Sequence, residues 1–181
     1  MGDHIKSVNN LSFILIVIIL FIGGCTQQPE KTKEAKALPH FPLNDLNGVI
    51  TQTGVELDRE VSSDGNGSLR ITAHEPTTVR LFEVKDIDIE DARLLYQARI
   101  RTRDVKGNVF LEMWVRLQGK GEFFTRNVHT PATGSVNWRM MEAPFFLKKG
   151  QNPDLVKLNL VIDGTGTAWI DDVKLVKAPL P

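Results

Sequence analysis

The sequence predicts an all-β domain, and three observations support this prediction. From Phe41 to about Val176, no segment shows the 3.6-residue periodicity of an amphipathic helix. Short segments in which apolar and polar residues alternate recur throughout the same region. Clusters of Gly, Asn, Asp and Pro separate these segments, as turns separate the strands of a sandwich or a barrel.

Each predicted strand lies between such breakers. Asp64-Gly65-Asn66-Gly67 precedes the third strand, Lys106-Gly107-Asn108 separates the fifth from the sixth, and Asp163-Gly164-Thr165-Gly166 precedes the last. The predicted strands are residues 48–51, 55–61, 68–73, 78–84, 93–102, 109–117, 122–128, 138–146, 155–162 and 167–176.

Two neighbouring strands alternate most regularly. Residues 93–103 place Leu94 and Tyr96 on one face and Arg99 and Arg101 on the other, and residues 109–116 separate aliphatic from polar positions in the same way. The segment between them, residues 104–108, suits a hairpin turn. The hairpin is then expected to bury its aliphatic face and to present these outward residues together: Arg99, Arg101, Glu112, Trp114 and Arg116.

The first 24 residues are predicted to be a lipoprotein signal peptide. A polar start with Lys6 precedes an apolar run of 12 residues, 11–22, with one Ser and no charge, which is shorter than the ~20 residues of a membrane-spanning helix. Ile22-Gly23-Gly24-Cys25 resembles a bacterial lipobox, and Cys25 is the only cysteine of the chain. The resemblance implies cleavage before Cys25 and acylation of its thiol, with palmitate among the expected acyl chains.

The lipobox sets the expected organisation and location. Residues 25–40 hold the lipidated cysteine and have the Pro, Glu, Lys and Gln content of a flexible tether, and residues 41–178 form the domain. The first partner is therefore the lipid bilayer, and the protein is extracytoplasmic, at the cell membrane or the outer membrane. Thr26 is not the aspartate that retains lipoproteins at the inner membrane, so the outer membrane is favoured in an organism with two membranes.

Two motifs make the fold prediction more specific. The segment Asp64-Gly65-Asn66-Gly67-Ser68-Leu69-Arg70-Ile71 resembles the turn and strand of galactose-binding-like jelly rolls, and Ile170-Asp171-Asp172-Val173 resembles their closing strand. That group includes carbohydrate-binding modules of cellulases and xylanases. The resemblance implies a two-sheet antiparallel jelly-roll β-sandwich that binds sugars on a concave face or at loop ends, often with a structural calcium ion.

The outward residues of the predicted hairpin have the chemistry of a sugar site. Trp114 would stack on a pyranose, and Arg99, Arg101, Glu112 and Arg116 would bind hydroxyl groups. In the alternative interpretation, the tryptophans pack in the core, with arginines over them by cation–π contact. The adjacent pairs Phe123-Phe124 and Phe145-Phe146 are each expected to place one ring in the core.

Asp64 and Asp171 are the candidate calcium ligands, and Asp172 is an alternate. This assignment follows from the jelly-roll resemblance, because Ca²⁺ takes several carboxylate and carbonyl oxygens. The alternative is that these aspartates cap turns by hydrogen bonds to the backbone.

Several classes of function are disfavoured. Equal numbers of basic and acidic residues, 22 each, argue against a nucleic-acid partner. A single cysteine excludes intrachain disulfides and cysteine-built zinc sites. No catalytic motif is present, although Glu112 facing Glu122 or Glu142 stays open as a glycosidase pair. The sequence therefore predicts a non-catalytic glycan-binding lipoprotein. The alternative is a structural or assembly protein that binds a protein partner through the same face.

Overall fold

The structure is a computed structural model that describes Gly2, residues 36–85 and residues 87–181. Residues Lys33–Pro181 form one compact unit, which contains every described strand and the buried core. A fragment of residues 26–181 therefore keeps this whole unit. No helix capable of crossing a membrane occurs among the described residues. The predicted signal peptide, 1–24, and Cys25 lie outside them.

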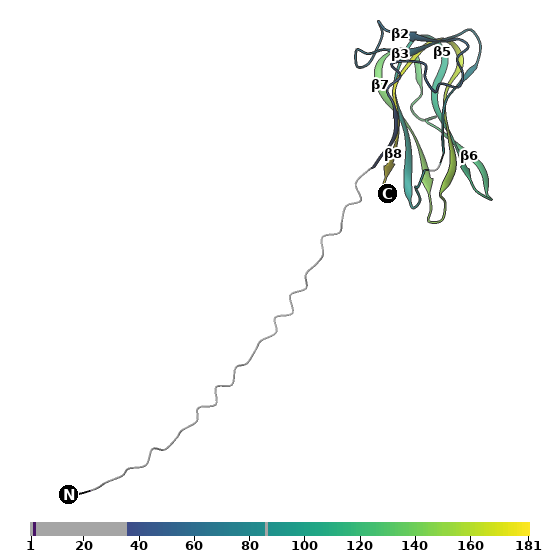
Figure 1. Cartoon of the computed structure of the whole chain (residues 1–181). Coiled ribbons are helices and arrows are strands. Elements are labelled where there is room, and N and C mark those ends of the chain that lie inside the picture. Colours follow the sequence, from purple (N-terminus) through teal and green to yellow (C-terminus); the bar gives the residue numbers. More distant parts are fainter. Residues whose placement is uncertain (1, 3–35, 86) are drawn as a thin grey trace. The chain divides into compact units, whose positions relative to one another are not determined.

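Eight antiparallel strands make up the domain, which confirms the all-β prediction (Figure 1). Each predicted strand from residue 55 onward corresponds to an observed one, although two pairs of predicted strands are merged. The strands are β1 Lys36–Phe41, β2 Val55–Asp58, β3 Ser68–Ala73, β4 Thr77–Lys85, β5 Ala92–Leu117, β6 Gly121–Arg126, β7 Ala132–Leu147 and β8 Pro153–Ala178.

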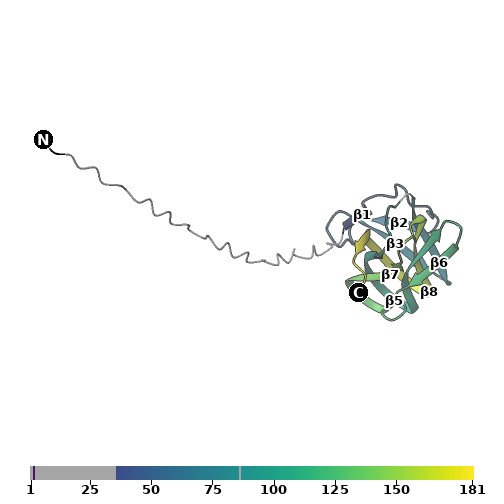
Figure 2. The same ribbon diagram turned by 90° about the horizontal axis from the view of Figure 1, so that it is seen from below.

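Strands β5 and β8 organise the fold. They pair with each other along almost their full length, from Arg93 opposite Ala178 to Leu117 opposite Pro153. The first half of β5 and the second half of β8, with β7, β3, β2 and β1, form what we call the first sheet. The remaining halves, with β4 and β6, form the second sheet. Figure 2 shows β1, β2 and β3 together on one side of the domain.

The hairpin predicted at residues 104–108 is wrong, because β5 continues through this segment as one strand. Gly107 lies opposite Gly164, and both have positive φ, 116° and 146°. A Cβ atom on Gly107 would lie 2.0 Å from the carbonyl oxygen of Asp163. The paired glycines therefore let two backbones approach closely, and β5 and β8 pass together from one sheet to the other at this corner.

Three register shifts interrupt the pairing of β5 with β8, one of them between Arg116 and Leu117 at the end of β5. The register also shifts by one residue between Arg103 and Lys106 on β5, and again between Asp171 and Lys174 on β8. Asp104 and Asp172 lie within these last two shifts and have positive φ, 54° and 52°. Each bulge adds one residue to one strand and so exchanges the face on which the following side chains lie.

Several segments differ from the prediction, among them β7, which begins at Ala132 rather than at residue 138. Residues 48–51 form no strand, and the strand that begins at Val55 ends at Asp58 rather than at residue 61. Residues 36–40 belong to β1, although the sequence assigned them to the tether. The physical reason is the ladder to β8, in which Phe41 lies opposite Val173, together with the stacking of Phe41 on Phe82 at 3.8 Å.

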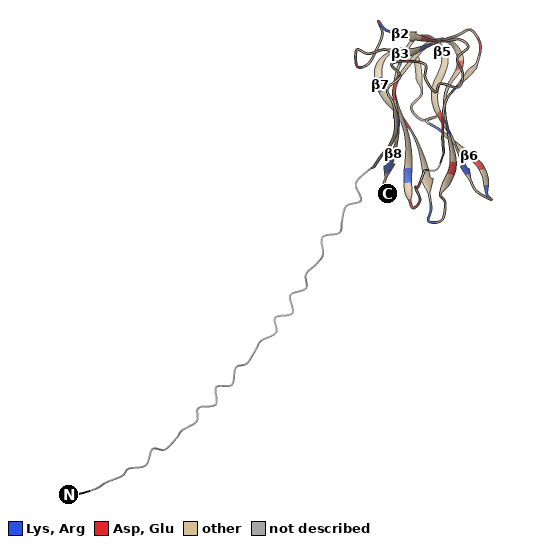
Figure 3. Ribbon diagram, viewed as in Figure 1, with Lys and Arg blue, Asp and Glu red and all other residues tan. Residues whose placement is uncertain are grey.

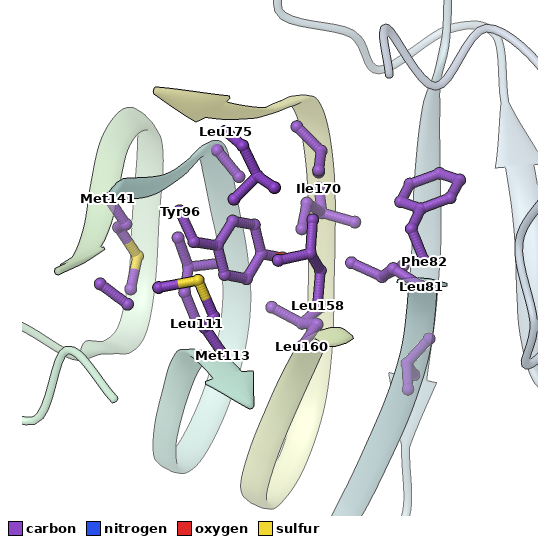
Figure 4. Close-up of a cluster of buried hydrophobic side chains, with 14 of the residues drawn as sticks. Leu81, Phe82, Tyr96, Leu111, Met113, Met141, Leu158, Leu160, Ile170 and Leu175 are labelled. Carbon is purple, nitrogen blue, oxygen red and sulfur yellow. The ribbon is translucent and has the colours of Figure 1, made fainter. Parts of the chain in front are cut away.

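The inward side chains of both sheets form one core (Figure 4). Tyr96 and Ile170 come from the first sheet, and Met113 and Leu158 come from the second. Because both sheets direct these residues toward the same interior, their outward faces point to opposite sides of the domain.

Candidate functional site

The structure places the five predicted ligand-binding residues on two faces rather than one. Arg99 and Arg101 lie on the outward face of the first sheet, whereas Glu112, Trp114 and Arg116 lie on the outward face of the second. The alternation within each half of β5 agrees with the prediction. The shared face does not form, because the corner carries the two halves to opposite sides of the core.

Glu112 is the centre of the second sheet's outward face. It is only 3% exposed, and it lies between Asn159 of β8 and Arg126 of β6 in the strand register. Its Oε1 accepts hydrogen bonds from Trp114 Nε1 at 2.8 Å and from Asn159 Nδ2 at 2.9 Å. Its Oε2 accepts one from Arg126 Nε at 2.6 Å. Burial raises the pKa of Glu112, but the three hydrogen bonds and the charge of Arg126 outweigh it and hold the pKa below its ordinary value.

An aromatic pair lies beside this carboxylate. Trp114 is half-buried, Phe124 is 56% exposed, and the two residues are directly opposite each other on β5 and β6. Their ring centroids are 5.0 Å apart, and the guanidinium of Arg126 lies 5.7 Å from the Phe124 ring. We call these four residues, Glu112, Trp114, Phe124 and Arg126, the aromatic face. Glu112 holds the indole and the guanidinium by hydrogen bonds, and the Phe124 ring packs beside both.

Arg116, the remaining predicted residue, lies one step further along the same face. The Nε of Arg116 donates to both carboxylate oxygens of Asp154, at 3.0 and 3.1 Å. These hydrogen bonds hold the pKa of Asp154 below its ordinary value. Figure 3 shows acidic and basic positions at both ends of the domain, in agreement with the balanced charge.

A groove adjoins the aromatic face. It has a volume of about 530 Å³ and runs between β6, residues 127–130 and β7. Phe124 and Arg126 line it from one side, and Phe146 and Glu142 from the other. Phe146 is 53% exposed, and Glu142 accepts a hydrogen bond from Gln97 at 2.6 Å. Two exposed rings and several polar groups thus line one open depression.

The phenylalanine pairs differ from each other. Phe145 packs against the core and Phe146 is exposed, as expected. The expectation for the other pair is wrong, because Phe123 and Phe124 are 45% and 56% exposed. Strand β6 pairs only with β5 among the described strands, and its inward side extends beyond the core. The alternation of apolar and polar residues in the sequence does not show that an edge strand extends beyond the core.

Trp169 on the first sheet follows the alternative interpretation. It is 3% exposed, and its Nε1 donates a hydrogen bond to Asp58 at 2.9 Å. The guanidinium carbons of Arg101 and Arg103 lie 5.7 and 5.2 Å from its ring. Burial raises the pKa of Asp58, but hydrogen bonds from Trp169 and from backbone N–H groups, with the charge of Arg70, hold it below its ordinary value. Trp169 is therefore a platform for arginines rather than for a sugar.

The hydrogen bonds of Asp64 and Asp171 are those of capping residues. Asp64 Oδ1 accepts from Ser62 Oγ and the Asn66 N–H, and Oδ2 accepts from the Asn66 side chain. Asp171 accepts from the backbone N–H of Ser63 at 2.8 Å and from that of Asp172 at 2.8 Å. All four carboxylate oxygens of Asp64 and Asp171 therefore accept hydrogen bonds in this structure. No cluster of three metal-ligating side chains occurs within the described residues.

The sequence matches no protein-family model and no curated protein. Solved structures nevertheless share its fold. The CBM22-1 xylan-binding domain from Paenibacillus barcinonensis is 11% identical, with a TM-score of 0.58, over 81% of this chain and 97% of that one. A Clostridium thermocellum xylanase structure of CBM22-1 and GH10 modules with xylohexaose is 11% identical, with a TM-score of 0.54, over 78% of this chain and 28% of that one.

A family 16 carbohydrate-binding module is also similar, at 12% identity and a TM-score of 0.50, over 67% of this chain and 84% of that one. These structures confirm the predicted fold class, an antiparallel jelly-roll β-sandwich of the kind found in carbohydrate-binding modules. At such low identity the likeness concerns the fold alone, so function has to be argued from the site.

Proposed function

We propose that this protein is a lipid-anchored, extracytoplasmic lipoprotein whose β-sandwich binds a glycan without modifying it. The observation that carries the glycan proposal is the aromatic face, in which the buried Glu112 holds Trp114 and the exposed Phe124 packs on Trp114 beside a groove. Carbohydrate-binding modules with the same fold, one of them a xylan-binding domain, support the proposal.

The chemistry of the face suits a sugar. A pyranose ring presents a C–H surface that packs on an aromatic ring, and its hydroxyl groups need donors and acceptors around that ring. Arg126 gives only its Nε to Glu112, so the other guanidinium N–H groups are directed elsewhere and are available for hydroxyl oxygens. Phe146 and Glu142 offer a second ring and an acceptor along the groove.

The carboxylates support binding rather than catalysis. A glycosidase requires one carboxyl group as a proton donor and a second facing it across the sugar. Both oxygens of Glu112 already accept hydrogen bonds, and Glu122 forms an ion pair with Lys157 at 2.7 Å. Glu142 is hydrogen-bonded to Gln97. None of the three is placed as an unengaged acid.

The anchor rests on Cys25, at the end of the short apolar segment. Acylation of this cysteine would tether the domain to a membrane on its extracytoplasmic side, with the outer membrane favoured where there are two. In cells supplied with labelled palmitate, the wild-type chain is expected to take up label and the Cys25→Ser variant is not. A wild-type chain without label would remove the anchor from the proposal and leave the glycan site untouched.

The glycan proposal is tested with the 26–181 fragment on a glycan array, followed by calorimetry with the glycans that bind. Phe124→Ala is expected to weaken binding by about 10- to 30-fold, as for a central aromatic contact, with little loss of stability because the ring is exposed. Phe123→Ala is the matched control, since Phe123 is also exposed but lies on the opposite side of β6. Equal affinity in both variants, or no bound glycan, would contradict the proposed site.

A protein partner is the second candidate function. The observation that favours it is the exposure of Phe123 and Phe124 on both sides of one edge strand. A protein that contacts β6 from both sides would lose affinity in both alanine variants, whereas a glycan on the aromatic face loses it only with Phe124→Ala. The same two variants therefore separate the two functions.

A further inference from the structure

The outward face of the first sheet carries a second pocket, on the side of the domain opposite the aromatic face. Its volume is about 350 Å³, which lies in the ~300–1,000 Å³ range of small-molecule sites. Arg101 and Arg103 line it together with Ser135 and Asn137, and Trp169 lies at its base.

The two arginines are held in place by an aromatic ring and not by a carboxylate. Their guanidinium carbons lie 5.7 and 5.2 Å from the same Trp169 ring. Neither guanidinium forms an ion pair with any residue that the structure describes, while Arg99 and Arg70 on the same face do. Two like charges are therefore kept close together, and their N–H donors face an open pocket.

The nearby acids have other partners. Asp58 accepts the indole hydrogen bond of Trp169 and lies 3.8 Å from Arg70. Asp104 accepts a hydrogen bond from Ser135 at 3.3 Å. Asn137 uses its Oδ1 on the backbone N–H of Trp138, so its amide N–H₂ is directed elsewhere. The pocket thus combines two uncompensated positive charges with neutral donors at its rim.

We propose that this arginine pocket binds the carboxylate of a uronic acid in an acidic glycan. Planar guanidinium groups match carboxylates by paired hydrogen bonds, and a bound anion would relieve the repulsion between Arg101 and Arg103. The amide N–H₂ of Asn137, which also lines the pocket, can donate to a hydroxyl group of the same sugar. The glycan nature of the ligand rests on the proposed function, but the pocket itself is separate from the aromatic face.

The test is an NMR titration of the ¹⁵N-labelled 26–181 fragment with the trimer of galacturonic acid, the neutral galactose trimer and inorganic phosphate. The indole N–H signals of Trp169 and Trp114 report on the two faces separately. We expect the acidic trimer to shift the Trp169 signal and to bind about tenfold or more tightly than the neutral trimer. The affinity is expected to fall between 0.05 and 0.5 M salt, because charge pairing is screened.

Variants connect the signal to the arginines. Arg101→Gln with Arg103→Gln is expected to abolish the preference for the acidic trimer, while Arg99→Gln, which removes one positive charge from a paired arginine nearby, keeps it. Because the double substitution removes the two arginines that cover Trp169, a melting curve is needed to show that this variant still folds. Arg101→Lys with Arg103→Lys keeps the charge and the cover of the ring, and its expected several-fold loss provides a second measurement if the glutamine variant unfolds.

Three results would overturn the inference. They are equal affinity for the acidic and neutral trimers at the Trp169 signal, a preference that survives in both double variants, and phosphate binding at the same signal as tightly as the acidic trimer. The last result would define a site for small anions only. Loss of neutral-glycan binding at Trp114 would instead concern the proposed function and leave the arginine pocket standing.

Discussion

Glu112 is expected to hold the aromatic face together. The structure allows the stability losses of two substitutions at this position to be estimated and ranked. Glu112→Gln keeps an acceptor for Trp114 and Asn159 but turns an amide N–H₂ toward Arg126, so one charge-assisted hydrogen bond is lost. Such bonds contribute about 1.5–3 kcal/mol, and Arg126 can recover part of this by reaching water, which leaves a loss of about 1–2 kcal/mol. Glu112→Ala also removes the acceptor from two part-buried donors and leaves a cavity, for about 3–5 kcal/mol.

Thermal melts check this order, with about 3 °C expected per kcal/mol for a domain of this size. The pH dependence gives a second check. The folded-state pKa of Glu112 is lower than its ordinary value of 4.5, so its contribution to stability is present above that value. It is lost as the pH falls through the lower, folded-state pKa. The gap between wild type and Glu112→Gln should therefore narrow as the pH falls below 4.5 and close below the folded-state pKa. Equal stability at pH 7, or a gap that does not change with pH, would refute the reasoning.

Three further predictions concern the corner, the turns and the core. Gly107→Ala should cost about 3 kcal/mol or more, because its Cβ would lie 2.0 Å from a backbone oxygen, whereas Gly119→Ala, with positive φ but open space, should cost about 1–2 kcal/mol in the same melts. A chelator should leave the melting temperature unchanged, since the oxygens of Asp64 and Asp171 already accept hydrogen bonds; a lower melting temperature that Asp64→Ala abolishes would support calcium instead. Tyr96→Phe should raise the free energy of unfolding by up to about 1 kcal/mol in denaturant titrations, because the Tyr96 hydroxyl is buried without a hydrogen-bond partner among the described residues. Weaker folding of that variant would reveal an unseen partner.

The sequence predicts which side chains of β5 are buried, and the structure agrees at each aliphatic position. Tyr96 and Ile100 in the first half and Leu111 and Met113 in the second are all fully buried. Alternation is a local property of a strand, so it can be read without knowing the partner strands. The burial of Phe145 and the exposure of Phe146 follow from the same property.

The path of the chain at residues 104–108, in contrast, depends on residues that are far away in the sequence. Lys106-Gly107-Asn108 has the composition of a turn, but the same composition suits a corner where two strands bend together. Only the register of Gly107 opposite Gly164 distinguishes these cases, and register depends on residues far apart in the sequence. One signal was present, because a second glycine-rich segment, residues 163–166, also divides two alternating runs.

The candidate site, too, could be predicted from the sequence only in part. Trp114 and Glu112 could be placed together from β5 alone, but Phe124, Arg126 and Asn159 come from the neighbouring strands β6 and β8. The sequence offers no means of aligning these strands to the residue. It also cannot show that both rings of the Phe123-Phe124 pair are exposed, because that depends on where the core ends.

The bulge at Asp104 explains why the two proposed sites are separate. The β5 residues of the hydrophobic core have even numbers from Ala92 to Ile100 and odd numbers from Val105 to Leu117. A regular strand would turn the second set outward, into solvent, and bury Glu112 and Trp114 in the core. The extra residue at Asp104 restores the aliphatic set to the interior just before the corner. The same extra residue therefore leaves the arginines on one outer side of the sandwich and the aromatic face on the other. A glycan bound at one face cannot cover the other, so the two sites can act on different ligands or on different parts of one long polymer.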